Sequence, residues 1–145
     1  EAFEKIRANL GSDPSEGVIV QKMVPGEREL AIGLIRDPQF GPCVMFGLGG
    51  IFTEILRDTS FRVAPITEED ALQMMDDIRA KDILGPVRGK PPVDRKLLAK
   101  ALVGLAKIGI EQENVAEIDV NPLIVAPDGT PVAVDALVVL STNGS

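Results

Sequence analysis

An alternating stretch near the carboxyl end, Glu117 to Val125, constrains the fold more than any other part of this sequence. After the run Pro127-Asp128-Gly129, a second strand-like stretch ends at Asp135. Proline suits the first central position of a type I turn, and glycine suits the left-handed residue that closes a three-residue hairpin loop. The sequence therefore predicts an antiparallel hairpin in which Ala126 pairs with Thr130.

This register brings polar side chains to one face of the hairpin. Asn121 is placed opposite Asp135, and because strand side chains alternate between faces, Asp119 is expected on the same face as both. Carboxylate and amide oxygens suit Mg²⁺, which proteins usually hold with one or two carboxylates together with water and nucleotide phosphates. The alternative is a solvated sheet face that carries several acids, and spacing alone leaves both open.

Composition limits the classes of protein that fit. The 145 residues, 45% of them hydrophobic, suffice for one domain with its own core. No apolar run approaches the ~20 residues that span a bilayer, so we expect no membrane association. A net charge of −7 without basic runs argues against nucleic acid as a partner.

The chain contains no histidine and a single cysteine, Cys43. Histidine acid–base chemistry, histidine metal ligation and phosphohistidine therefore cannot occur within these residues. One cysteine excludes an internal disulfide and fits a reducing, cytoplasmic compartment. Because Cys43 lies in an apolar run, we expect a buried structural thiol.

Hydrophobic periodicity and the positions of glycine and proline predict the other elements. Helices are expected over residues 1–10, after the capping-box-like Thr67 and after Asp94, the last with a buried stripe of Leu98, Ala101, Leu102, Leu105 and Ala106. Strands are expected over Gly17–Met23, Glu29–Arg36, Pro42–Phe46, Ile51–Leu56 and Phe61–Val63, whereas the proline- and glycine-rich residues 82–93 should form neither helix nor central strand. Met74 and Met75 are expected in the core. Hairpin connections dominate, so we predict a single α+β domain over residues 1–145, a mostly antiparallel sheet with two helices on one face.

Three further stretches suggest ligand contacts, each beside a simpler alternative. The backbone N–H groups of Gly49 and Gly50 would suit phosphate oxygens, with Glu54 on the same edge, or the glycines form a structural turn. The Arg88-Gly89 loop would suit an anion, or it is an exposed surface loop. The stretch Gln21 to Val24 would suit an adenine edge, with Glu29 accepting from ribose hydroxyls, or it is part of an ordinary hairpin.

Together these stretches resemble the C-terminal part of the ATP-grasp domain of ADP-forming (NDP-forming) acyl-CoA synthetases, relatives of the succinyl-CoA synthetase β subunit. The resemblance runs roughly from Gly17 to Val139 and depends on the order and spacing of five stretches: Val20–Glu29, Phe46–Asp58, Phe61–Pro65, Arg88–Asp94 and Glu117–Leu123. It implies an ATP-grasp C-terminal subdomain that binds ATP or ADP and Mg²⁺.

The resemblance also implies roles for individual residues. Gln21, Lys22, Met23 and Val24 would receive adenine and Glu29 the ribose, while Asn121 and Asp135 would hold Mg²⁺ with Asp119 on the same face. The whole enzyme would interconvert acyl-CoA, ADP and phosphate with free acid, CoA and ATP, with a phosphohistidine carrying phosphate between sites.

The chain begins with Glu1 rather than Met, and we expect it to be a fragment of a longer multidomain protein. The N-terminal ATP-grasp half, with its phosphate-binding lysines, and the CoA-binding and phosphohistidine domains would be its partners. Alone, it is expected to be inactive and to bind ATP weakly or not at all. Two alternatives stay open: a regulatory ATP-grasp-like domain of a multidomain protein acetyltransferase, and a generic α/β interaction module.

Overall fold

The fold is seen in a computed structural model that describes residues 1–10, 18–50 and 57–141. In chain order its elements are α1 (Ala2–Leu10), β1 (Arg28–Asp37), β2 (Gly41–Leu48), β3 (Thr59–Val63), α3 (Glu68–Asp77), the 3₁₀ helix η1 (Lys81–Leu84), α4 (Arg95–Glu111), β4 (Val115–Val125), β5 (Pro131–Ala133) and β6 (Leu137–Leu140). None of the described helices has the length and apolar character that crossing a bilayer requires.

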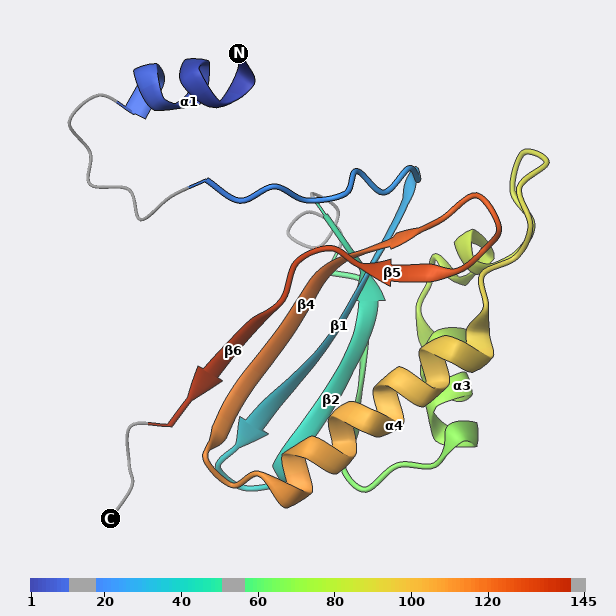
Figure 1. The fold of residues 1–145 in the computed structure, drawn as a ribbon. Helices are drawn as coiled ribbons and strands as arrows, with labels where there is room; N and C mark the ends of the chain where they lie inside the picture. Colours follow the sequence, from blue (N-terminus) through green and yellow to red (C-terminus); the bar gives the residue numbers. More distant parts are fainter. Residues whose placement is uncertain (11–17, 51–56, 142–145) are drawn as a thin grey trace.

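The strands form one antiparallel sheet in the order β3-β2-β1-β4-β5, with β6 also paired to β4. Helices α3 and α4 lie against one face of this sheet (Figure 1). The predicted α+β architecture is therefore confirmed. The core between the layers combines strand residues with helix residues and includes Leu30, Leu34, Val44, Phe46, Met74, Met75, Leu98 and Leu102.

Local signals place both covering helices where the sequence predicts them. The Thr67 hydroxyl accepts from the backbone N–H of Asp70 at 3.1 Å, and the Asp70 carboxylate accepts from the Thr67 N–H at 2.8 Å. At the start of α4, the Asp94 carboxylate accepts from the Leu97 N–H at 3.0 Å. Each cap satisfies backbone donors that the first helical turn leaves without intrahelical partners.

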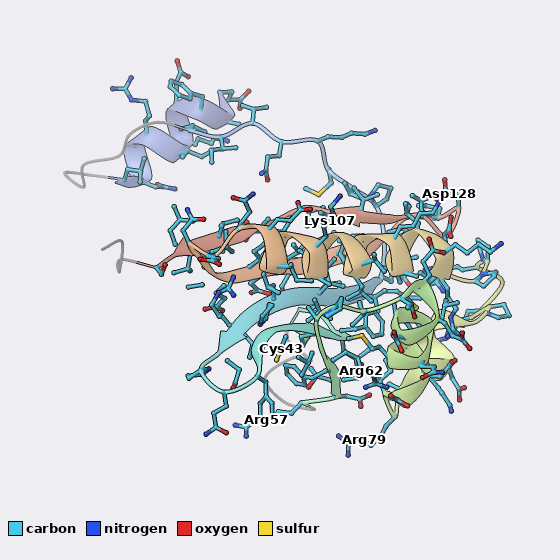
Figure 2. The ribbon with its side chains drawn as sticks, turned by 90° about the horizontal axis from the view of Figure 1, so that it is seen from below. Cys43, Arg57, Arg62, Arg79, Lys107 and Asp128 are labelled. Carbon is cyan, nitrogen blue, oxygen red and sulfur yellow. The ribbon has the colours of Figure 1, made fainter. Side chains whose placement is uncertain are left out.

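Two predictions about sulfur-containing residues are also confirmed. Met74 and Met75 are fully buried in α3, as core residues. Cys43 lies on β2 as a free, buried thiol (Figure 2). Burial, and secondarily the negative charge of Asp37, raises the pKa of the Cys43 thiol, so its reactive thiolate form is disfavoured.

The hairpin forms with the predicted register. The Ala126 N–H donates to the Thr130 carbonyl at 2.8 Å, and Gly129 takes the left-handed conformation with φ +92°. The strand expected after the turn is interrupted, however, and two short strands, β5 and β6, pair with β4 in its place. Register is the same on both sides of the interruption, from Leu123–Ala133 to Asp119–Leu137, so Asp135 lies in the gap, opposite Asn121.

Three predictions need correction or fall outside the described residues. The strand expected over Gly17–Met23 is wrong for its described part: residues 18–23 pair with no strand, because β1 already pairs with β2 and β4 along both edges. Within residues 82–93, the chain forms part of η1 and a tight Val87–Lys90 bridge, although no α-helix or central strand. The strand expected over Ile51–Leu56 lies outside the described residues.

Candidate functional site

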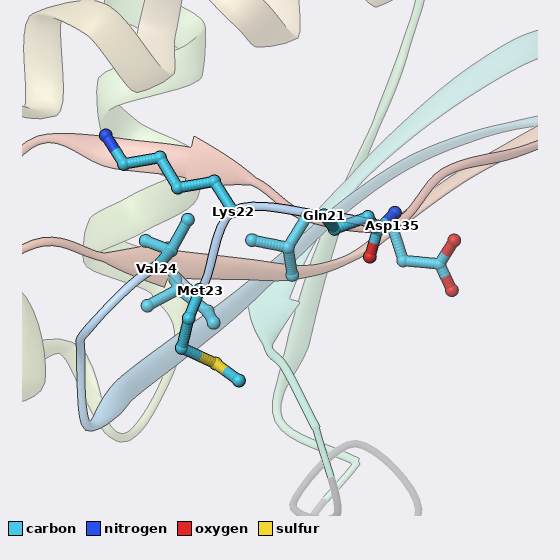
Figure 3. Close-up of a pocket in the computed structure, with 7 residues that line it drawn as sticks. Gln21, Lys22, Met23, Val24 and Asp135 are labelled. Carbon is cyan, nitrogen blue, oxygen red and sulfur yellow. The ribbon is translucent and has the colours of Figure 1, made fainter. Parts of the chain in front are cut away.

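A cavity of about 440 Å³ joins two parts of the chain that the sequence singles out separately. Gln21, Lys22, Met23 and Val24 line it together with Asp135, and Ile124 and Val134 complete the lining (Figure 3). The cavity volume is within the usual range of small-molecule sites, about 300–1,000 Å³. The predicted adenine-binding stretch therefore shares a cavity with one of the three predicted metal ligands, Asp135, whereas Asp119 and Asn121 are not among the lining residues.

The stretch that lines the cavity enters the sheet through a buried arginine. Arg28, only 6% exposed, begins β1. Its guanidinium donates to the backbone carbonyls of Ile83 at 3.2 Å, Gly85 at 3.1 Å and Pro91 at 2.8 Å. A guanidinium has five donors in a rigid fork and no acceptor, so these carbonyls hold it in one orientation and fix where the preceding stretch leaves the sheet.

A glycine turn brings four predicted residues together. The Gly50 N–H donates to Asn121 Oδ1 at 3.0 Å, and the Gly49 N–H donates to the Glu29 carbonyl at 2.9 Å. Gly50 has φ +61°, and a Cβ there would collide with the Glu29 carboxylate. Because both N–H groups donate to protein acceptors, the turn alternative explains them in this structure.

Asp119 has two acids nearby, Glu117 on the same strand and Asp135 across the hairpin. Burial raises the pKa of the half-buried Asp119 carboxyl, and the negative charges of Glu117 and Asp135 raise it further. Within the described residues, the Asp119 carboxylate has no hydrogen-bond or ion-pair partner. Carboxylates gathered without a cation are the arrangement that a bound metal ion relieves.

Few side chains near Asp119 could serve as ligands for a metal ion. Across residues 1–10, 18–50 and 57–141, no three Asp, Glu, His or Cys side chains lie close enough to hold a metal by themselves. The candidate ligands are therefore the Asp119 and Asp135 carboxylates with the Asn121 amide oxygen, which retains a lone pair beyond its bond to Gly50. Such a set fits Mg²⁺, since this ion keeps several waters and uses few protein ligands.

The Arg88-Gly89 loop is a tight hairpin that contacts the segment just before β1. Arg88 and Gly89 have φ +48° and +77°, and Val87 and Lys90 exchange backbone hydrogen bonds of 3.2 and 2.9 Å. Lys90 Nζ pairs with the Glu27 carboxylate at 2.6 Å. That hydrogen bond, with the charge of Lys90, lowers the pKa of Glu27. Arg88 is exposed at the tip, and its charge also lowers the pKa of Glu27.

The structure leaves one predicted site residue undescribed and adds another. Glu54 lies outside the described residues. Arg28 is not identified from the sequence. Its burial could have been inferred, because Arg28 continues the core-facing alternation of Leu30, Ile32 and Leu34 along β1.

The sequence matches a protein family and named relatives. A family model described as "ATP-grasp domain" matches residues 1–140. The chain is 49% identical over 144 residues to the acetate–CoA ligase [ADP-forming] I subunit beta of Pyrococcus furiosus, covering 97% of this chain and 62% of that protein. It is 44% identical over 133 residues to the acetate–CoA ligase [ADP-forming] I of Archaeoglobus fulgidus, covering 89% of this chain and 19% of that protein.

Solved structures agree with these relatives. The dinucleotide-forming acetyl-coenzyme A synthetase 1 of Candidatus Korarchaeum cryptofilum, in complex with coenzyme A, Ca-AMPCP and HgCl⁺, superposes with a TM-score of 0.84 at 47% identity, covering 97% of this chain and 61% of that chain. The same enzyme with coenzyme A and Mg-AMPPCP, its phosphohistidine segment pointing towards the nucleotide binding site, gives 0.77 at 50% identity, covering 82% and 55%. Because the family match extends over nearly the whole sequence, this chain belongs to the ATP-grasp family.

Proposed function

We propose that the chain is the nucleotide- and magnesium-binding part of an ADP-forming acyl-CoA synthetase. The observation that carries the proposal is the cavity that Gln21–Val24 share with Asp135. The relatives are named ADP-forming acetate–CoA ligases. The reaction in this proposal converts acid, CoA and ATP to acyl-CoA, ADP and phosphate. The chain spans 62% and 19% of those two relatives, so the remaining steps belong to other parts of the enzyme.

Gln21 to Val24 receive the adenine in this proposal. The stretch lies outside the sheet, and within the described residues its backbone groups make no hydrogen bond to other backbone groups. Free N–H and C=O groups at a cavity wall are suited to read the edge of a base. Glu29, next to the Gly50 turn, accepts from the ribose hydroxyls.

Asp119, Asn121 and Asp135 hold Mg²⁺ in this proposal. A bound ion would neutralise charge on the phosphoryl group being transferred, the main requirement of such chemistry. Metal ligands must be deprotonated, and burial together with nearby negative charge raises the pKa of Asp119. Metal affinity should therefore increase with pH until the Asp119 carboxyl is fully ionised.

Group transfer needs further parts of the enzyme. This sequence has no histidine, so a phosphohistidine must come from another segment, as in the relative whose phosphohistidine segment points towards the nucleotide binding site. The N-terminal ATP-grasp half and the CoA-binding domain are the other partners. We place the enzyme in the cytoplasm, in keeping with the one cysteine of these 145 residues, which is free. The isolated chain should bind nucleotide weakly and catalyse nothing.

Titration calorimetry with Mg²⁺–ADP on the whole enzyme tests the proposal. Asp135→Asn removes a candidate ligand at an exposed position, whereas Glu117→Gln removes a charge nearby that is outside the donor set. We expect about tenfold or greater weakening, roughly 1.4 kcal/mol, for Asp135→Asn and little change for Glu117→Gln. Equal affinities for wild type and Asp135→Asn would contradict the metal assignment.

A further inference from the structure

Helix α4 carries a second apolar stripe beside the one buried in the core. Leu97, Ala101, Gly104 and Ile108 follow one another at helical spacing and line a groove of about 510 Å³. Leu97 and Ile108 are 41% and 39% exposed. Ala101, expected on the buried stripe of this helix, is packed against the core and also lines this groove. The opposite wall comes from the hairpin, through Val120, Leu123, Pro131 and Ala133.

The groove borders the less covered half of the sheet. The principal contacts of α3 and α4 are with β1, β2 and β3, and Figure 1 shows β6 at the side of the sheet away from both helices. Val138 in β6 lies opposite the buried Ile118 and shares its face, yet it is exposed. In an α+β fold each apolar sheet face is buried against another layer, so there is room for one more helix beside α4.

Charge specifies what kind of helix fits. Helix α4 carries Arg95, Lys96, Lys100 and Lys107 against a single acid, Glu111, although the whole chain has a net charge of −7. Helical spacing puts Lys96, Lys100 and Lys107 in a row along the outer edge of the groove, and Figure 2 shows Lys107 on α4. A helix seated there would place its own flanking residues next to these cations.

Small residues allow a close approach. A Cβ added at Gly104 would meet nothing within 4 Å, and Ala101 lies one turn away on the same stripe. Low side-chain volume at the centre of a helix surface lets a second helix pack near the short end of the usual 8–10 Å interaxial range.

We propose that this groove, bounded by α4 and the β4–β5 hairpin, docks an amphipathic helix whose apolar stripe is bordered by Asp and Glu. The helix comes from another domain or subunit of the same enzyme, a point that rests on the proposed function. The two relatives named above have 38% and 81% of their length outside the part matched, ample for such a helix. Helix α1 of this chain does not fit, because its charges, Glu4, Lys5 and Arg7, are of mixed sign.

Site-specific photo-crosslinking in the intact enzyme identifies the occupant. A benzophenone amino acid replaces Ile108 in the groove or, as the matched control, Ile110, which is 49% exposed on the same helix outside the groove. We expect position 108 to crosslink to a helical peptide of another domain or subunit with acidic residues flanking its apolar stripe. Crosslinks to α1 or to a second copy of this chain, or equal yields at both positions, would overturn the proposal.

A charge variant tests the same surface by affinity. Gly104→Glu interrupts the stripe and repels an acid-bordered helix, while the loss of glycine favours the α-helix itself. Assembly of the helix with the groove, measured as the crosslinking yield from position 108, should weaken by about tenfold or more, and Ile110→Glu should leave it unchanged. Unaltered assembly of Gly104→Glu would overturn the proposal. Neither measurement involves nucleotide, so failure here and failure of the nucleotide-site proposal are distinguishable.

Discussion

Asp58, beside the sheet, and Asp119, on β4, are two carboxylates with opposite surroundings. Asp58, just before β3, is 6% exposed and accepts from the backbone N–H groups of Arg79 and Ala80, both at 2.8 Å. Burial alone would raise its pKa, but these hydrogen bonds and the Arg79 guanidinium lower the pKa of Asp58 below its usual value. Asp119, in contrast, meets burial and like charge, and its pKa is raised.

The difference separates a structural carboxylate from a candidate functional one. A buried acid with two backbone donors and a cation is satisfied, and it ties the start of β3 to the end of α3. A carboxylate held near other carboxylates costs stability unless a ligand arrives, and groups with pKa values perturbed in this way gather at functional sites. The same residue type thus stabilises the fold in one region and opposes it in the other.

The largest expected effect tests the functional side of this comparison. Asp135→Ala in the whole enzyme should reduce turnover by about 100-fold or more, the size found when one preorganised electrostatic contact to a transition state is removed. Its stability should barely change, because the Asp135 side chain is exposed. Steady-state kinetics and urea unfolding of the same samples measure both quantities.

Glu117→Ala is the matched control, since Glu117 is also an exposed acid near Asp119. Its turnover should stay close to wild type. If Asp135→Ala lost stability and kept its rate, Asp135 would be a structural residue like Asp58.

The second-largest expected effect tests the structural role of Asp58. Asp58→Ala leaves the N–H groups of Arg79 and Ala80 without their acceptor, and each unsatisfied buried donor costs about 1–3 kcal/mol. We expect the free energy of unfolding to fall by roughly 2–4 kcal/mol, as measured by urea denaturation. Asp58→Asn keeps one acceptor oxygen and should lose less. Equal stability of all three proteins would show that these hydrogen bonds contribute nothing net.

Local signals made much of this fold predictable from the sequence. Thr67 and Asp94 mark helix starts because a capping side chain acts on the next three residues alone. The hairpin register follows from loop length, so Asn121 and Asp135 were placed opposite each other correctly. These features depend on neighbours in the chain, which a sequence shows directly.

Features that depend on distant partners were missed. The apolar residues Ile19 and Val20 resemble a strand, but a strand forms only beside a free edge, and the edges of β1 are taken by β2 and β4. The acceptors of Arg28 lie 55 to 63 residues away, and periodicity cannot reveal them. Ala101 is packed against the core as expected, but its second role in lining the groove was not predicted, because the opposite wall comes from the later hairpin.

The smallest expected effect is on the pH dependence of stability, which should differ between Asp119 and Asp58. The folded-state pKa of Asp119 is raised, so folding is favoured while this carboxyl keeps its proton and is penalised once it ionises. The penalty is absent below the unfolded-state pKa and complete above the folded-state pKa. Asp119→Asn, studied without divalent cations, should therefore stabilise the chain at neutral pH by about a few tenths of a kcal/mol, the scale of cross-strand charge pairs.

Thermal unfolding from pH 3 to pH 8 measures this gain. The advantage of Asp119→Asn should appear as pH rises through the titration of Asp119 and vanish at the acid end, whereas Asp58→Asn should lose stability most at neutral pH, where the Asp58 carboxylate is ionised. Opposite pH dependences at these two acids would confirm that one is satisfied by protein and the other is not. If Asp119→Asn were destabilising at neutral pH, Asp119 would have a stabilising partner in the folded protein, and the contrast with Asp58 would fail.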